Sequence, residues 1–260
     1  MKKILVVLLA LVLALAMVAC GDNGDAKDTD AVSDTAADTA EDTAADTAAD
    51  TEDVADVTVM SYAEYAAAEI DAPVVIEAYV QAKQSWWDNK ATIYTQDQDG
   101  AYFIYEMVCS EEDYAKLVPG TKIRVSGYKA DFQGEIELAS GATFEFIDGA
   151  DTYVAEPVDL TAVLGTEELI NYQNQLASFK GMTVEAVEFK NGEPGDDIYV
   201  TLGLNGASYS FCVEFYLTGT DTEVYQTVSA LEVGDVVDVE GFVYWYQGVN
   251  PHITAVTVAE

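Results

Sequence analysis

The sequence is poor in the residues that most enzymes use for metal binding and acid–base chemistry. Its 260 residues include 1 His and 3 Cys, which removes most routes to a zinc site or a histidine-based catalytic triad. Basic residues are also scarce, with 11 Lys plus Arg against 47 Asp plus Glu and a net charge of -36. Such a negative field repels polyanions and disfavours a general nucleic-acid binder. The 50% of hydrophobic residues still allows substantial cores.

The first 20 residues have the pattern of a secretory signal peptide. Lys2 and Lys3 precede an unbroken apolar run, residues 4–19, and its 16 residues are fewer than the roughly 20 that span hydrocarbon. The segment resembles a bacterial lipoprotein signal with its lipobox, although Met17 stands where Leu is usual. The resemblance implies that Cys20 becomes diacylglyceryl-modified and palmitate-bearing, and anchors the protein on the extracytoplasmic face of the bacterial cell membrane. An ordinary cleaved signal and an uncleaved anchor are the alternatives.

Residues 21–57 form an acidic, low-complexity segment. They contain 13 Asp plus Glu, 1 Lys and no aromatic residue, and Asp recurs every four residues between Thr and Ala. In a helix these aspartates would stack on one face and repel one another. The composition therefore predicts a disordered spacer that holds the folded part away from the membrane. An acidic docking tail is the alternative.

Residues 58–260 are rich in β-branched and aromatic residues, and they contain an internal repeat. Eight residues recur 114 positions later: Leu117, Gly120, Val125, Gly127, Tyr128, Phe132, Gln133 and Gly134 match Leu231, Gly234, Val239, Gly241, Phe242, Tyr246, Gln247 and Gly248. The repeat predicts two homologous domains, residues 58–150 and residues 151–260.

Each copy has the same predicted order of elements: three strands, a short helix and two strands. Asp99-Gly100 and Asn205-Gly206 are typical two-residue hairpin turns between the second and third strands. In the third strands, the residues expected to face the core are Phe103, Tyr105 and Met107 in one copy and Tyr209, Phe211 and Val213 in the other. Capping boxes at Ser110–Asp113 and Thr220–Glu223 predict the helix starts, and residues 61–70 and 166–175 have helical patterns.

This order is that of the OB-fold, a five-stranded Greek-key barrel. The predicted fold class is all-β with short helices: two tandem OB-like barrels behind a disordered acidic spacer. With the signal and spacer, the motifs at residues 118–127 and 244–252 resemble those of exported bacterial lipoproteins with tandem OB-fold domains. The resemblance implies a binding or stress-related module, without a settled chemistry.

OB-folds bind ligands on strands two and three and on the loops that flank them, which predicts a site in the first copy. The candidate residues in or near these loops are Trp86, Trp87, Lys90, Lys129 and Phe132, and Lys122 and Arg124 in strand four alternate with apolar residues and point away from the core. Aromatic rings beside cations suit stacking on bases or sugars and pairing with phosphate. The alternative is that the tryptophans cover the barrel mouth or the interdomain seam.

The second copy lacks the basic strand, because Val236 and Asp238 stand 114 positions after Lys122 and Arg124. Its candidate residues are instead Tyr244, Trp245, Tyr246, Asn250 and His252. They form an amide-rich aromatic surface that suits carbohydrate, peptide or a partner domain. Packing within the core and the hairpin is the alternative.

The remaining polar motifs are weaker. Asp97-x-Asp99-Gly100 mimics the start of a calcium loop, but the matching Asn205-Gly206 favours simple hairpin geometry. Asp196-Asp197, near Glu193, is a separate candidate for a cation. Cys109 is expected to face inward and Cys212 outward, which argues against a disulfide. His252 has no partner histidine or cysteine pair with which to form a catalytic site.

Together these features predict a lipid-anchored, non-enzymatic binding module that needs no cofactor. Its charge favours a neutral or cationic partner, such as a wall glycan, a peptide or an exported protein. The alternative is binding of single-stranded nucleic acid or another oligoanion by the first barrel. The oligomeric state stays open.

Overall fold

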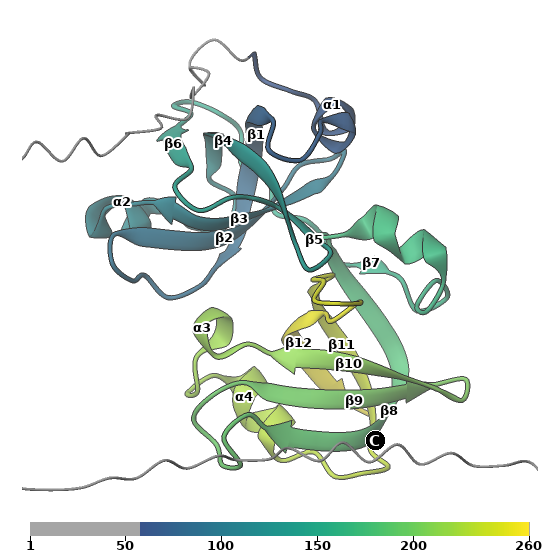
Figure 1. Ribbon diagram of the computed structural model, residues 1–260. Helices are drawn as coiled ribbons and strands as arrows, with labels where there is room; N and C mark the ends of the chain where they lie inside the picture. Colours follow the sequence, from purple (N-terminus) through teal and green to yellow (C-terminus); the bar gives the residue numbers. More distant parts are fainter. Residues whose placement is uncertain (1–57, 260) are drawn as a thin grey trace, which may run out of the picture. The chain divides into compact units, whose positions relative to one another are not determined.

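The computed structural model describes residues 58–259, and the protein there is mostly β with short helices (Figure 1). The predicted signal peptide, the lipidation site at Cys20 and the acidic spacer lie outside the described residues. Within residues 58–259, none of the helices has the length and apolar character needed to cross a membrane.

The first sheet forms a closed barrel with the strand order of an OB-fold. Its strands are adjacent in the order β1-β2-β3-β5-β4, and pairing of β1 with β4 closes the barrel. β3 and β5 run parallel and the other neighbours antiparallel. The elements are β1 (Pro73–Lys83), β2 (Lys90–Gln96), β3 (Ala101–Val108), α2 (Glu111–Lys116), β4 (Lys122–Phe132) and β5 (Glu135–Leu138). The predicted order of three strands, a helix and two strands is confirmed.

The second sheet repeats this topology. The order is β11-β12-β10-β9-β8, and pairing of β11 with β8 closes it; β10 and β12 are the parallel pair. The elements are β8 (Leu176–Phe189), β9 (Ile198–Leu204), β10 (Ala207–Val213), α3 (Phe215–Thr218), α4 (Glu223–Ser229), β11 (Val236–Phe242) and β12 (His252–Val258). The chain therefore contains two tandem OB-like barrels.

Short elements surround the two barrels. β6 (Thr143–Phe146) pairs with β4, and β7 (Val158–Asp159) pairs with β8. The helical pattern at residues 61–70 forms α1 (Tyr62–Ala67), and the pattern at residues 166–175 forms the 3-10 helix η2 (Glu167–Tyr172). Both are shorter than the sequence pattern indicates.

The helix cap is correctly predicted in the first barrel and displaced in the second. Ser110 caps α2, and its Oγ accepts a hydrogen bond from the Asp113 N–H at 3.1 Å. In the second barrel the cap is Thr222, two residues after the predicted Thr220. The reason is the additional helix α3, which ends at Gly219 with a φ of 77°, so that the next helix starts later.

The predicted inward alternation of the third strand is wrong for part of the first barrel. Tyr102 and Ile104 lie in the core together with Met107, whereas Phe103 and Tyr105 face outward. In the second barrel the alternation is as predicted: Phe211 and Val213 are buried in the core, and Tyr209 packs against it.

A β-bulge causes this change of face in β3. The pairing between β2 and β3 shifts between Ala91 and Ile93, and Glu106 adopts a φ of 44°. The Glu106 N–H donates to Thr92 Oγ1 at 3.0 Å, which holds the bulge in place. Because an extra residue reverses the side-chain direction of the strand, the sequence alternation fails on one side of it.

A small aromatic cluster joins the barrels. Tyr94 of β2 stacks on Phe242 of β11, with ring centroids 4.1 Å apart and planes 7° apart. Phe103 contacts both Tyr94 and Tyr244 edge-on or tilted. These three cluster residues, Tyr94, Phe103 and Phe242, are at most 3% exposed, so the seam is a hydrophobic contact in its own right.

A buried carboxylate adds polar contacts to the seam. Glu135 of β5 accepts hydrogen bonds from Asn174 Nδ2 at 2.6 Å, the Trp245 N–H at 2.9 Å and Gln173 Nε2 at 3.4 Å. All three donors come from the part of the chain that carries the second sheet. The first barrel therefore supplies the acceptor and the second supplies the donors.

Candidate functional site

The exposed aromatic side chains gather at one place. Among the described residues, six aromatic side chains are exposed, by 37–66%, and all six line a single cleft of about 690 Å³. They are Trp87, Tyr105, Phe132, Tyr199, Tyr216 and Tyr246. We call this feature the inter-barrel cleft. An exposed apolar patch of this kind marks an interaction or ligand site more often than a bare surface.

Both barrels contribute corresponding elements to the inter-barrel cleft. The first contributes the β1–β2 loop, β2, β3 and the β4–β5 hairpin, and the second contributes the β8–β9 loop, β9, β10 and the β11–β12 connection. These are strands two and three and the flanking loops of each OB-fold, where the fold ordinarily binds ligands. The two ligand faces therefore share one cleft.

The cleft brings together seven of the predicted ligand-binding residues. They are Trp87, Lys90, Phe132, Tyr244, Tyr246, Asn250 and His252. Three come from the first barrel and four from the second, so residues of the two predicted surfaces line one cleft.

The predicted basic strand lies elsewhere. Lys122 and Arg124 point away from the core, as expected, but both bind Glu77 of β1, at 3.0 Å and 2.7 Å. Arg124 also binds Glu145 at 2.6 Å. These ion pairs lower the pKa of Glu77 against the opposing effect of its partial burial. The two cations stabilise the β1–β4–β6 face and are absent from the cleft lining.

Lys129 has a structural environment. Its side chain is 5% exposed, and Nζ donates to the carbonyl oxygens of Tyr65, Ala66 and Ala68 at 2.8–3.0 Å. It therefore donates to carbonyl groups at the end of α1, where the helix leaves backbone acceptors without intrahelical partners; the Tyr65 carbonyl also accepts from the Ala68 N–H at 3.2 Å. Burial lowers the pKa of Lys129.

Two of the three tryptophans also pack outside the cleft. The Trp86 Nε1–H donates to the Cys109 carbonyl at 2.9 Å, which fixes the half-buried ring beside the first barrel. Trp245 packs against the second core. The sequence alternative, in which tryptophans serve packing, describes these two, whereas Trp87 is 66% exposed.

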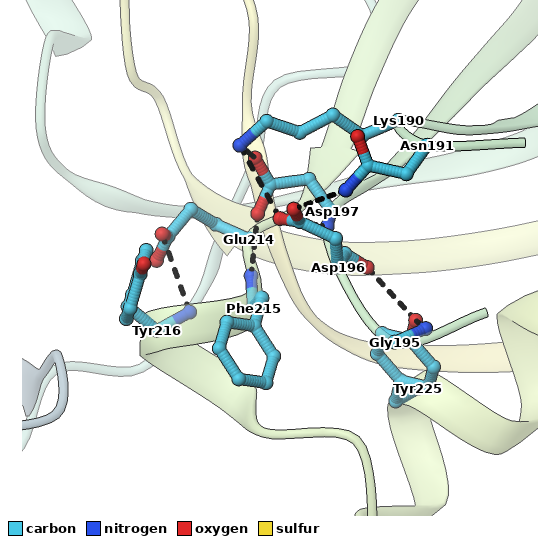
Figure 2. A network of polar contacts seen from close by, with 9 residues as sticks. All are labelled: Lys190, Asn191, Gly195, Asp196, Asp197, Glu214, Phe215, Tyr216 and Tyr225. Carbon is cyan, nitrogen blue, oxygen red and sulfur yellow. Dashed lines mark hydrogen bonds and ion pairs between the residues drawn. The ribbon is translucent and has the colours of Figure 1, made fainter. Parts of the chain in front are cut away.

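The two ammonium groups of the cleft are already paired. Lys90 Nζ lies 2.8 Å from Glu106 Oε2, and this contact lowers the pKa of Glu106. Lys190 Nζ lies 2.9 Å from Asp197 and 3.2 Å from Asp196, as Figure 2 shows. The carboxylates raise the pKa of Lys190. Neither cation is free to hold a phosphate.

The acidic candidate at Glu193, Asp196 and Asp197 is occupied by protein groups. Besides Lys190, Asn191 Nδ2 donates to Asp196 at 2.8 Å, and the Phe215 N–H donates to Asp197 at 2.9 Å (Figure 2). Across residues 58–259, no group of three or more His, Cys, Asp and Glu side chains is placed to hold a metal ion. The calcium-like turn behaves as a hairpin, because Asp97 Oδ1 accepts from the Asp99 and Gly100 N–H groups.

Three buried glutamates lie at the cleft or at the seam. Burial raises the pKa of Glu135 to about 8, against the lowering effect of its hydrogen bonds from Asn174 and Trp245. Burial also raises the pKa of Glu137 to about 7. Glu214 lines the cleft, and burial together with the nearby Asp197 raises its pKa to about 7.

His252 forms part of the cleft wall and part of the seam. Its Nδ1 lies 2.9 Å from the Tyr94 hydroxyl, and its ring stacks on Tyr244 with centroids 4.2 Å apart. Burial lowers the pKa of His252 to about 3, so the ring is neutral near pH 7. It supplies a flat apolar surface, and its bond to Tyr94 joins β12 to β2.

Several cleft residues were missed by sequence reasoning, and a usable signal existed for two of them. Cys212 matches Glu106 at an offset of 106, and both were assigned to the outward face. In an OB-fold the outer face of strand three is a ligand face, and both residues line the cleft. No such signal marks the other lining residues that were missed, Gln84, Ser85, Thr92, Lys190, Tyr199, Glu214 and Tyr216.

The two described cysteines are as expected. Cys109 lies in the first core and Cys212 lines the cleft, and both are free thiols. Burial raises the pKa of Cys212 well above its ordinary value. It is therefore a thiol rather than a thiolate near pH 7, and a poor nucleophile.

No protein-family model matches the chain, and no curated protein sequence matches it. Among solved structures, the chain is similar to asparaginyl-tRNA synthetase from Pyrococcus horikoshii, with a TM-score of 0.28 and 18% identity over 33% of this chain and 19% of that one. It is similar to the p204 HINb domain, with a TM-score of 0.33 and 11% identity over 73% and 98%. It is also similar to a murine DNA binding protein bound with double-stranded DNA, with a TM-score of 0.35 and 11% identity over 72% and 95%. The fold assignment rests on the strand order, and these likenesses identify no ligand.

Proposed function

We propose that the protein is a non-enzymatic binding module whose inter-barrel cleft takes a neutral or cationic ligand. The observation that carries this proposal is the gathering of all six exposed aromatic side chains of the described chain in that cleft. The cleft volume of about 690 Å³ lies within the usual range of ligand sites, about 300–1,000 Å³. A short glycan or a peptide segment has suitable dimensions.

The aromatic walls suit ligands with flat or apolar faces. A ring that stacks on an aromatic side chain gains about 1–3 kcal/mol when the partner is a base, and sugar faces and peptide side chains offer comparable apolar surface. Six such rings, from both barrels, allow stacking at several points along one ligand. Polar groups between them can fix its orientation.

The charges disfavour an anionic ligand. Residues 58–260 contain eight basic side chains against 34 acidic ones. Every one of the eight is engaged: six form ion pairs, and the other two, Lys83 and Lys129, donate to backbone carbonyl oxygens. A phosphate would have to displace a carboxylate at 2.6–3.2 Å from its cation.

Nucleic acid is the competing ligand. The strand order is an OB-fold, and a DNA-bound structure is among the solved proteins of similar fold. Phosphate contacts by Lys and Arg supply most of the affinity in such complexes. The predicted cations Lys122 and Arg124 are paired with Glu77 and lie outside the cleft, so the charge distribution favours the neutral or cationic ligand.

Binding titrations separate the two functions. The full chain is titrated with an N-acetylglucosamine tetramer, a lysine-containing peptide and an oligothymidine, and tryptophan fluorescence and calorimetry are recorded. We expect binding of at least one of the first two probes, and about a 5- to 150-fold loss of affinity in Tyr246→Ala. The control is Val233→Ala, an exposed residue outside the cleft.

Oligothymidine binding at low salt that weakens steeply with added salt would favour nucleic acid. Loss of that binding in a Lys122→Glu/Arg124→Glu variant would assign it to the basic strand. If no probe binds, or if Tyr246→Ala leaves binding unchanged, the cleft is not the site.

We also propose that Cys20 anchors the module on the extracytoplasmic face of the bacterial membrane. The support is the apolar run followed by Ala19-Cys20. In a bacterial host, the chain is expected to incorporate labelled palmitate and to sediment with membranes. Cys20→Ser should lose both properties, and label retained in this variant would contradict the proposal.

A further inference from the structure

One buried carboxylate of the cleft, that of Glu214, has an oxygen without a hydrogen-bond partner among the described residues. Glu214 is 9% exposed, and its Oε2 has no hydrogen-bond partner among the described residues. Its other oxygen, Oε1, accepts a long bond from the Tyr216 N–H at 3.3 Å (Figure 2). The Tyr216 and Leu217 N–H groups both act on the carboxylate and partly offset the effect of burial on its pKa. A buried carboxylate in this state is costly unless a donor or a cation satisfies it.

The protein does not supply that cation. Lys190 is the nearby ammonium group, and its Nζ is bound between Asp196 and Asp197. Asp197 adds a second negative charge close to Glu214 and contributes to the raised pKa of Glu214. The second ammonium group of the cleft, Lys90, is bound to Glu106.

The surroundings of Glu214 combine this acceptor with aromatic faces. Tyr216 and Tyr244 line the cleft with it, and both present ring surfaces that attract cations. Asn250 Oδ1, also in the lining, is a second buried acceptor without a partner within residues 58–259. These two acceptors can each accept a hydrogen bond from a donor on a ligand. The terminal torsion of a glutamate is soft, so either oxygen can turn toward the cleft.

We infer that the Glu214 end of the inter-barrel cleft takes a protonated primary amine, carried on an aromatic or saturated body that stacks in the rest of the cleft. This inference rests on the proposed function, because it names the ligand class of the same site. An ammonium group offers three donors and a charge, which matches an unsatisfied carboxylate flanked by tyrosines. A hydroxyl donor would satisfy one oxygen and leave the charge uncompensated.

The pH dependence follows from the groups that face Glu214. They are Asp197 and Lys190 beside β9, Cys212 of β10, Tyr94 of β2 and Tyr244 of the β11–β12 connection, with His252 also in the lining. The pKa values of the two tyrosines and of the thiol are raised, and that of His252 is about 3. Glu214, with a pKa of about 7, titrates between pH 6 and 8 within the cleft lining. Glu135 and Glu137, with pKa values of about 8 and about 7, titrate in the same range outside the lining, so the Glu214→Gln variant assigns the pH dependence.

Matched probes test the inference on the full chain. Tyramine and tyrosol share a phenol ring and a two-carbon chain, and differ in an amine against a hydroxyl. Nα-acetyl-lysine methylamide and its 6-hydroxynorleucine analogue also differ in an amine against a hydroxyl, here on a peptide, and this pair distinguishes a peptide source from a small aromatic amine. Affinities are measured for the parent chain, Glu214→Gln and Glu106→Gln, whose carboxylate is already paired.

We expect the amine probe of at least one pair to bind more tightly than its neutral partner. Glu214→Gln should weaken amine binding about 10- to 150-fold and leave the neutral probe unchanged, while Glu106→Gln has a smaller effect. Amine binding should also strengthen about tenfold per pH unit up to the pKa of Glu214, and this dependence should vanish in Glu214→Gln.

Equal binding of both members of each pair would overturn the inference. So would equal losses in Glu214→Gln and Glu106→Gln, because net charge alone would then explain the preference. The proposed function is judged separately: neutral probes that bind and are lost in Tyr246→Ala support the cleft even if the amine preference fails. Thermal unfolding of each variant shows that it is folded.

Discussion

The hydrogen bond between Tyr94 and His252 is the sharpest test of how the two barrels are joined. The bond is 2.9 Å long, and the two residues are 0% and 6% exposed. Tyr94→Phe removes only the hydroxyl, since the ring retains its stacking on Phe242 and its contact with Phe103. The change therefore isolates the polar contribution to the seam.

The magnitude follows from what the change leaves behind. A neutral intramolecular hydrogen bond contributes about 0.5–1.5 kcal/mol, and a buried group left unpaired costs about 1–3 kcal/mol. His252 Nδ1 loses its partner within a hydrophobic seam. We expect Tyr94→Phe to lower the free energy of unfolding by about 1–3 kcal/mol.

Urea unfolding followed by tryptophan fluorescence measures this loss, provided that the slope of the unfolding free energy against urea concentration is the same in the parent and the variant. The matched control is Tyr102→Phe: its hydroxyl lies 3.4 Å from Asp97 Oδ2, at the long end of hydrogen bonding, so a smaller loss is expected. Because the chain has one histidine, its ring signals in a proton NMR spectrum need no assignment and report any change at His252.

Unfolding of Tyr94→Phe at the same urea concentration as the parent, with the His252 signals unmoved, would refute the reasoning. The hydroxyl would then contribute nothing to the seam. A large loss in Tyr102→Phe would also contradict it, because the cost would not follow the geometry of the bond.

The remaining predictions concern pH and the buried lysine. The buried glutamates have raised pKa values, so the folded chain holds more protons than the unfolded chain between about pH 4.5 and 8, and stability should fall as pH rises through this window. His252, with a lowered pKa of about 3, opposes this trend only below about pH 6.5. Urea midpoints at pH 5, 7 and 9 test this, and Glu137→Gln should reduce the slope; a midpoint that rises with pH would contradict it. Lys129→Met should lower the free energy of unfolding by about 1–3 kcal/mol, because it leaves carbonyl groups at the end of α1 without a donor. Lys180→Met removes an exposed ion pair and should lower it by at most about 1 kcal/mol. Equal urea midpoints for the two variants would show that Lys129 does not stabilise the end of α1.

Much of the fold was predictable because it depends on local patterns. Strand alternation, the Asn205-Gly206 turn and the Ser110 cap are all short-range features, and the internal repeat allowed each copy to check the other. The first hairpin turns over residues 97–100, where the Asp97 N–H donates to the Gly100 carbonyl, so the predicted two-residue turn is displaced there. The bulge at Glu106 was not predictable, because glutamate has no special preference for a φ of 44°. Its cause is a tertiary contact, the bond to Thr92.

The candidate site was only partly predictable for a related reason. Aromatic residues in OB loops indicated a ligand face on each barrel, and residues such as Trp87 and Tyr246 do line the cleft. Of the charged candidates, Lys90 lines the cleft, whereas Lys122 and Arg124 lie outside its lining and form ion pairs with residues distant in sequence. Nothing near Arg124 in the sequence indicates that Glu77 and Glu145 will neutralise it.

The presence of two barrels with the same strand order bears on how the proposed site could be selective in a negatively charged chain. Two identical faces would form a symmetric cleft, which would bind a ligand equally tightly in either of two opposite orientations. Here the corresponding positions have diverged: Glu106 is neutralised by Lys90, whereas Cys212 at the matching position leaves Glu214 beside it without a cation. The wall from the first barrel therefore carries a carboxylate that is paired with a lysine, whereas the wall from the second barrel carries a carboxylate without a paired cation. The amine ligand proposed above, with an apolar body and one cationic end, would satisfy both walls in a single orientation, so the difference between the two barrels would give the cleft its direction.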